Sequence, residues 1–231
     1  MPAHKTHFAV AQQLNKVLKL DSDLFTLGNV LPDLTVEHNH QKSHFQNGIK
    51  WTINGTANPD LFLETYKIDS TIMLGYLAHL LTDQFWNNFL YNTYYLYDAN
   101  KNVYGLIIKG QKTNLNIEKI KETKKNELHL FDKYLLVNKK INKFNSDQCV
   151  KKVKDLNDLH FDKNYLKNYI KDANEEIDKY KNNIFSIFYH PDYQLSNQKE
   201  LNKVFNDCCN YILEYFKKNN IDIKKIKESN L

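Results

Sequence analysis

Apolar and polar side chains alternate with a helical period along most of this chain. Within residues 5–19, apolar side chains recur every three or four positions, from Phe8 to Leu18, which predicts a first helix. Asp21 and Asp23 directly after it are suited to cap a short second helix. The same period predicts later helices around residues 113–140, 146–158, 163–182 and 197–218.

The longest apolar stretch predicts a central, buried helix. From Ser70 to about Tyr95 large apolar side chains occupy every face, so a helix there belongs inside the protein. The helix before it begins at Asn58-Pro59-Asp60, which supplies a capping Asn, a Pro in the first turn and an acid. That helix is expected to end near Lys67.

Three stretches break the helical pattern. Residues 28–45 contain a Pro and several ionisable side chains without a period, which predicts a loop, and residues 98–102 predict a turn. Residues 221–231 predict a fraying basic tail. We therefore expect an all-α protein, a single compact bundle of several helices over residues 1–220 followed by that tail.

Composition supports this fold class. Six Gly and four Pro are few for a sandwich or barrel of many short strands, while 15 Tyr and 13 Phe provide a large core.

All 32 basic residues are Lys. A chain without Arg lacks the planar fork that binds guanine or phosphate bidentately, so no specific nucleic-acid partner is expected, although residues 101–231 are basic.

No segment predicts secretion or a membrane span. The beginning lacks a signal-peptide pattern, and no apolar run reaches the ~18 residues that a membrane helix needs, so we expect a cytoplasmic protein.

The three cysteines form neither a disulfide framework nor a metal knuckle. We expect Cys149, Cys208 and Cys209 to pack as small apolar residues. The oligomeric state cannot be read from the sequence.

Candidate chemistry gathers in the first third of the chain, which holds six of the nine histidines. His79 and Asp83 stand four residues apart on the central helix and so share one face. Burying this pair is costly unless its charge is compensated, and a divalent cation compensates it well. The alternative is that the two side chains hydrogen-bond each other or the backbone inside the core.

Further metal donors lie in the predicted loop. Asp33 follows Pro32, and His44 follows closely behind it, which adds the oxygen and nitrogen ligands typical of zinc. Taken singly, Asp33 could be a turn residue and His44 a solvated one. His38 and His40 are rivals to His44, because a His-x-His pair can also bind a metal.

The ordered set of these motifs resembles the bacterial zinc-dependent phospholipase C family, whose fold is shared by the single-strand-specific zinc nucleases. The resemblance covers roughly the first 90 residues and is carried by four motifs. These are Thr6-His7, Gly28-x-x-x-Pro32-Asp33, Ser43-His44-Phe45, and the run from Gly75 to Asp83 with Trp86.

The resemblance implies two zinc ions. Asp33, His44 and His79 would hold one, and Asp83 would bridge it to a second that also binds His7. It further implies hydrolysis of a phosphoester, most often a phosphodiester, by a metal-activated hydroxide, with Asp33 also in the position of a general base. A small phosphoester or a phospholipid would be the substrate.

The chain also departs from the family's pattern. Relatives hold a third zinc with residues soon after the bridging aspartate, whereas Phe89 stands there and no His follows until His129. Secreted relatives use a mature N-terminal Trp, for which His4 is a possible substitute. An interaction or scaffold protein on a degenerate hydrolase fold is therefore the alternative function. An HD-type phosphohydrolase would require a contiguous His-Asp pair, which is absent.

Overall fold

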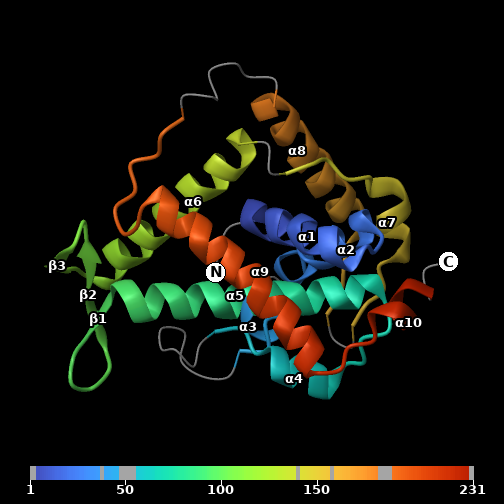
Figure 1. Ribbon diagram of the computed structural model, residues 1–231, viewed down its shortest axis with the longest axis horizontal. Helices are drawn as coiled ribbons and strands as arrows, with labels where there is room; N and C mark the ends of the chain where they lie inside the picture. Colours follow the sequence, from blue (N-terminus) through green and yellow to red (C-terminus); the bar gives the residue numbers. More distant parts are fainter. Residues whose placement is uncertain are drawn as a thin grey trace.

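Helix α5 (Thr71–Tyr94) runs through the middle of the protein, with α1 and α2 on one side and α4 on the other (Figure 1). The computed structural model describes residues 4–36, 39–46, 56–138, 141–156, 159–181 and 189–228. The other elements are α1 (His4–Leu18), α2 (Ser22–Gly28), the 3₁₀ turn η1 (Leu31–Asp33), α3 (His40–Ser43), α4 (Pro59–Thr65), β1 (Tyr95–Tyr97), β2 (Val103–Ile108), β3 (Gln111–Asn114), α6 (Ile117–Val137), α7 (Ser146–Lys152), α8 (Lys163–Lys181), α9 (Gln198–Lys218) and α10 (Ile223–Glu228).

The expected mainly helical fold is confirmed. The predicted caps are in place, because the side chains of Asp21, Asn58 and Ser70 accept hydrogen bonds from the first turns of α2, α4 and α5. Helix α5 is buried on several faces, as its composition predicts, and packs against α1, α2, α4 and α9. The three cysteines are free and buried, as expected. No helix in the described ranges is long and apolar enough to cross a membrane.

A small antiparallel sheet was not predicted. Strands β1, β2 and β3 follow one another directly after α5, so the fold is not purely helical. Lys109 and Gly110 form the two-residue loop between β2 and β3, and both have positive φ, the conformation that favours a tight hairpin. The helical period expected from residue 113 onwards therefore begins only at Ile117, after β3.

The C-terminal residues also differ from expectation. Residues 221–231 were expected to form a fraying tail, but Ile223–Glu228 form helix α10, and Ile226 is buried in the hydrophobic core. Ile221 and Ile223 are partly buried and pack against the same core, so three isoleucines anchor this Lys-rich segment.

Helices α2 and α5 touch backbone to backbone. A Cβ atom added to Gly28 would lie 2.2 Å from the carbonyl oxygen of Ile72, and one added to Gly75 would lie 2.4 Å from that of Phe25. Such distances are far inside van der Waals contact, so both positions require Gly. This close crossing brings the segment after α2 against the middle of α5.

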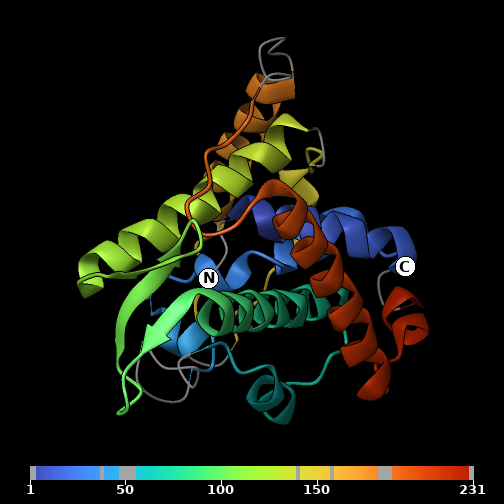
Figure 2. The same ribbon diagram turned by 60° about the vertical axis from the view of Figure 1, so that its left-hand side comes forward.

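Helix α6 fixes the beginning of α1. The carboxylate of Asp132 accepts hydrogen bonds from the backbone N–H groups of Lys5 (2.9 Å) and Thr6 (2.8 Å) and from the Thr6 hydroxyl (2.7 Å). Burial raises the pKa of Asp132 to about 6, although these hydrogen bonds favour its ionised form. Helix α6 lies beside α8, as Figure 2 shows, so α1 is tied to the C-terminal half of the chain.

Candidate metal centre

The structure brings together all five residues singled out in the sequence. His7 comes from α1, Asp33 from the end of η1, His44 from the residue that ends α3, and His79 and Asp83 from α5. The side chains of the three histidines and Asp83 are 0% exposed, and that of Asp33 is 4% exposed. Four segments therefore converge on one buried cluster of imidazoles and carboxylates.

Three imidazoles surround the carboxylate of Asp83. The Nε2 atom of His7 lies 3.3 Å from one oxygen, and the Nε2 atoms of His44 and His79 lie 3.1 and 3.4 Å from the other. Within the described residues, neither oxygen of Asp83 has a hydrogen-bond partner, and neither do the two ring nitrogens of His7. A buried polar atom without a partner costs about 1–3 kcal/mol, so this cluster has strong potential to bind a cation.

Asp33 has its own ring of imidazoles. The Nε2 atom of His44 lies 3.4 Å from Oδ1, and the Nδ1 atom of His40 lies 3.5 Å from the same oxygen. The Nε2 atom of His4 lies 3.4 Å from Oδ2. His40 is thus a neighbour of His44 and not only its rival, while His38 lies outside the described residues.

Backbone carbonyls fix the tautomers of the two central histidines. The Nδ1 atom of His79 lies 2.8 Å from the carbonyl oxygen of Asn29, and that of His44 lies 2.9 Å from the carbonyl oxygen of His40. Because a carbonyl oxygen only accepts, each Nδ1 must donate, and the neutral ring then has a lone pair on Nε2. Backbone support of this kind is typical of metal-binding histidines.

The two Nε2 atoms meet in the centre of the cluster. Those of His44 and His79 are 3.0 Å apart, and two lone pairs at this distance repel each other unless a proton or a metal ion lies between or beside them. The rings of His7 and His79 are stacked, with centroids 3.9 Å apart, which leaves their ring edges free to face ligands. The geometry therefore suits either one protonated imidazole or bound cations.

The ionisation of the cluster favours a cation. Burial opposes ionisation of Asp83, but the attraction of His79 and the close approach of the Nε2 atoms of His44 and His7 outweigh it, so its pKa lies well below the usual value. The pKa of Asp33 is lowered in the same way. Burial lowers the pKa of His44, yet Asp33 and Asp83 raise it to about 9. At neutral pH, the imidazolium of His44 therefore lies between two ionised carboxylates.

The donor atoms divide into two groups, each with ligand atoms within 4.8 Å of one another: His7, His79 and Asp83 form one, and Asp33, His40 and His44 form the other. The resemblance placed His79 with Asp33 and His44 instead. The Nε2 atom of His79 lies 3.9 Å from Asp33 and 3.4 Å from Asp83, so these distances are compatible with either assignment. Nitrogen and carboxylate donors without thiolates suit zinc or a similar divalent transition metal.

We expect metal binding to displace the proton of His44. Its raised pKa of about 9 means that the folded, metal-free protein holds this proton at pH 7, and the ligand must lose it. Zinc affinity should rise roughly tenfold per pH unit from pH 7 and level off above about pH 9. Calorimetry in buffers of different ionisation enthalpy measures the released protons. Uptake of zinc at pH 7 without proton release would contradict the expectation, and the exposed His160→Gln variant is the control.

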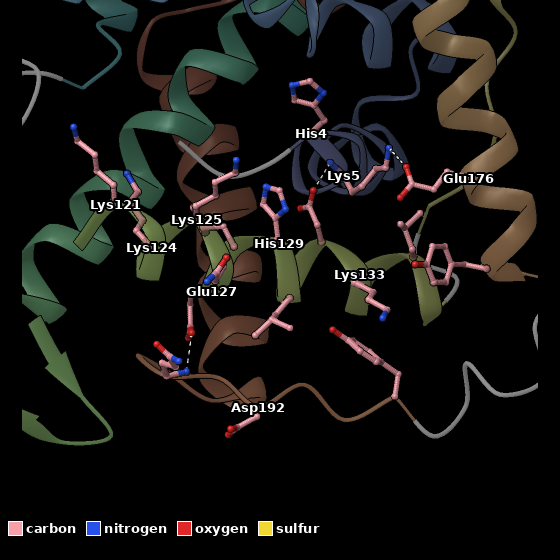
Figure 3. A pocket seen from close by; sticks show the side chains of 18 of the residues that line it. His4, Lys5, Lys121, Lys124, Lys125, Glu127, His129, Lys133, Glu176 and Asp192 are labelled. Atoms are coloured by element: carbon pink, nitrogen blue, oxygen red, sulfur yellow. Dashed lines mark hydrogen bonds and ion pairs between the residues drawn. The ribbon is translucent and has the colours of Figure 1, made fainter. Parts of the chain in front are cut away.

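One side of the cluster opens to a cleft. A cavity of about 1070 Å³ is lined at one end by His4, Asp33 and His40, and along one wall by α6 (Figure 3). His7, His44, His79 and Asp83 are not among its lining residues. A ligand in the cleft would therefore reach the cluster through Asp33.

Sequence reasoning considered His40 only as a rival to His44, missed the cleft, and left His4 as a possibility. The His40-x-x-x-His44 spacing places both rings on one side of the short helix α3, a signal that the sequence does contain. Trp86, which belongs to the last of the four motifs, is fully buried beside Phe131 and does not line the cleft. Phe89, at the position of the absent third-zinc ligand, packs against Trp86 and Tyr94.

Comparison of the chain with protein-family models, with curated proteins and with solved structures gives no match. The resemblance of the first 90 residues therefore stays a prediction, and the function is argued from the geometry of the cluster.

Proposed function

We propose that this chain is a hydrolase that uses two divalent ions, preferably zinc, to cleave a phosphoester, and most readily a phosphodiester. One observation carries the proposal: backbone carbonyls accept from the Nδ1–H groups of His44 and His79, so that their Nε2 atoms lie 3.0 Å apart and face two buried carboxylates. Ions bound there would supply Lewis-acid stabilisation of phosphoryl oxygens and lower the pKa of a water molecule.

The residues of the chain have distinct tasks in this proposal. His7, His44, His79 and Asp83 are completely buried and hold the ions away from bulk water. Asp33 alone among the five residues lines the cleft, so it is placed to touch both an ion and the substrate. Because its lowered pKa keeps it ionised, Asp33 can accept a proton from the attacking water.

A specific observation favours the scaffold alternative. Four of the five donors have no exposure, and a closed shell of four protein ligands is typical of a structural zinc site. In that case the protein would bind metal for stability without hydrolysing anything. Metal content and activity must therefore be measured on the same samples.

The test compares the wild-type protein with His79→Ala, both purified without chelators or a histidine tag. We expect about two zinc ions in the wild type, fewer in the variant, and hydrolysis of bis(p-nitrophenyl) phosphate only by the wild type. His160→Ala, an exposed histidine paired with Asp155, is the matched control and should behave like the wild type. Zinc-loaded protein that cleaves neither phosphodiesters nor phosphomonoesters would favour the scaffold, and protein that binds no metal even after reconstitution would overturn both.

A further inference from the structure

The cleft beside Asp33 has a basic wall that the hydrolytic centre does not use. Helix α6 places Lys121, Lys125 and His129 at intervals of four residues, which puts them on one face. Figure 3 shows Lys125 and His129 extending from α6 into the side of the cleft where His4 lies. His4 and Asp33 interact at 3.4 Å, so this wall stands next to the outer end of the metal centre.

The carboxylates around the cleft already have donors of their own. Glu127 accepts hydrogen bonds from the backbone N–H groups of Gln194 (2.8 Å) and Ser196 (2.9 Å). Asp132 caps α1 through backbone N–H groups. Glu176 and Asp192 form ion pairs with Lys5 and Lys109, and the fifth lining acid, Asp33, faces His4 and His40. Within the described residues, none of these contacts involves Lys124 or Lys125.

Lys124, which also lines the cleft, Lys125 and His129 have no ion pair with an acid within the described residues. The Nζ atom of Lys124 lies 2.8 Å from the side-chain oxygen of Asn87 and 4.9 Å from the ring centroid of Tyr91, which fix its position without neutralising it. Across the described part of the chain, Lys125 and His129 have neither an ion pair nor a hydrogen bond. His129 has at least one ring N–H to donate in either protonation state.

The surroundings of the cleft favour a soluble ligand over a lipid surface. The large apolar side chains exposed in the described ranges are Val17, Val36, Tyr104 and Tyr165. None of them lines the cleft, and the exposed side chains that do line it are polar or charged, which does not favour entry into a bilayer. Its volume of about 1070 Å³ is sufficient for a molecule of nucleotide size.

We propose that Lys124, Lys125 and His129 bind a second phosphate of the substrate, while its phosphodiester lies at Asp33. The inference rests on the proposed function and narrows its substrate class to soluble phosphodiesters that carry an additional phosphate monoester. Ammonium and imidazole N–H groups are suitable donors to a phosphate dianion, and such charge-assisted hydrogen bonds are stronger than neutral ones. The wall then selects the substrate, and the metal centre cleaves it.

A matched pair of chromogenic esters tests the proposal. One is the p-nitrophenyl ester of thymidine 5′-phosphate, and the other is the same ester with a 3′-phosphate, so the nucleoside serves only as a carrier. We expect the zinc-loaded wild type to cleave the 3′-phosphorylated ester with a kcat/KM at least about tenfold higher than that for the ester without the 3′-phosphate. The ratio of these two kcat/KM values is the quantity to compare between variants. In the Lys125→Gln/His129→Gln double variant, this ratio should fall to near one. Lys203→Gln, an exposed lysine of α9 outside the cleft, should keep the wild-type ratio.

The outcomes separate the two proposals. A wild-type ratio near one, or a ratio unchanged in the double variant, would overturn the basic wall as a phosphate site while leaving hydrolysis intact. If neither ester is cleaved, the proposed function fails, and calorimetry with thymidine 3′,5′-bisphosphate and thymidine 5′-phosphate decides about the wall. The basic wall would be supported if the wild type bound the bisphosphate at least about tenfold more tightly than the monophosphate and the double variant lost this difference. Equal affinities of the wild type for the two ligands would overturn it.

Discussion

Asp83→Asn is expected to release bound metal and abolish hydrolysis in a single step. The Asp83 carboxylate lies within 3.1–3.4 Å of three imidazole nitrogens, so all three histidines share it as a neighbour. The amide of Asn has the same shape, but it carries no charge and directs an NH₂ group at the histidines. Activity should therefore fall to the uncatalysed rate.

Unfolding with and without chelator shows whether Asp83 acts through metal. Chelation should lower the free energy of unfolding of the wild type by several kcal/mol, because bound ions stabilise only the folded state, and it should leave the variant unchanged. When both proteins are metal-free, their free energies of unfolding should differ much less, because His44 keeps the carboxylate of Asp33 as an ion-pair partner. Metal content that equals that of the wild type would disprove the bridging role. Asp207→Asn, on the surface of α9, is the control.

Gly75→Ala is expected to destabilise the protein by several kcal/mol and to weaken metal binding. The new methyl group would lie 2.4 Å from the carbonyl oxygen of Phe25 and 2.9 Å from the backbone nitrogen of Asn29, so α2 and α5 must separate. The carbonyl of Asn29 fixes the ring of His79 at 2.8 Å, and its displacement would loosen that ligand. A backbone clash at Gly75 is therefore expected to displace His79, which lies one helical turn away on α5.

Chemical denaturation and zinc titration of the same sample test this coupling. Gly110→Asn is the matched control, because Gly110 has a φ of +80°, which Asn tolerates, and a side chain there meets nothing within 4 Å. Its effect on stability should stay below about 1 kcal/mol. A Gly75→Ala protein as stable as the wild type would show that the helix crossing is not tight.

Local pattern predicts the helices of this fold, but not how segments distant in the sequence meet. The caps at Asp21, Asn58 and Ser70 and the buried α5 can be predicted because each depends on a few adjacent residues. The hairpin at Lys109-Gly110 also has a local signal that sequence reasoning missed, because Gly110 follows the strand-forming run at residues 103–108.

The five candidate ligands could be named from the sequence because they lie in a recognisable order of motifs, and the structure places them in one cluster. The role of His40 depends on α3 folding back against η1, in a segment without periodicity. The cleft depends on Asp132 meeting the beginning of α1, a contact between residues 126 positions apart. No pattern within a short window contains such information.

The Asp132 contact has a consequence for the order in which the protein becomes competent to bind metal during its synthesis. All five candidate ligands have left the ribosome once Asp83 has, but the beginning of α1 still lacks the carboxylate that caps it. We expect the nascent chain to hold zinc weakly until α6 has emerged and docked. Tight zinc binding would then require the C-terminal half of the chain, and truncated chains that lack α6 would bind zinc weakly.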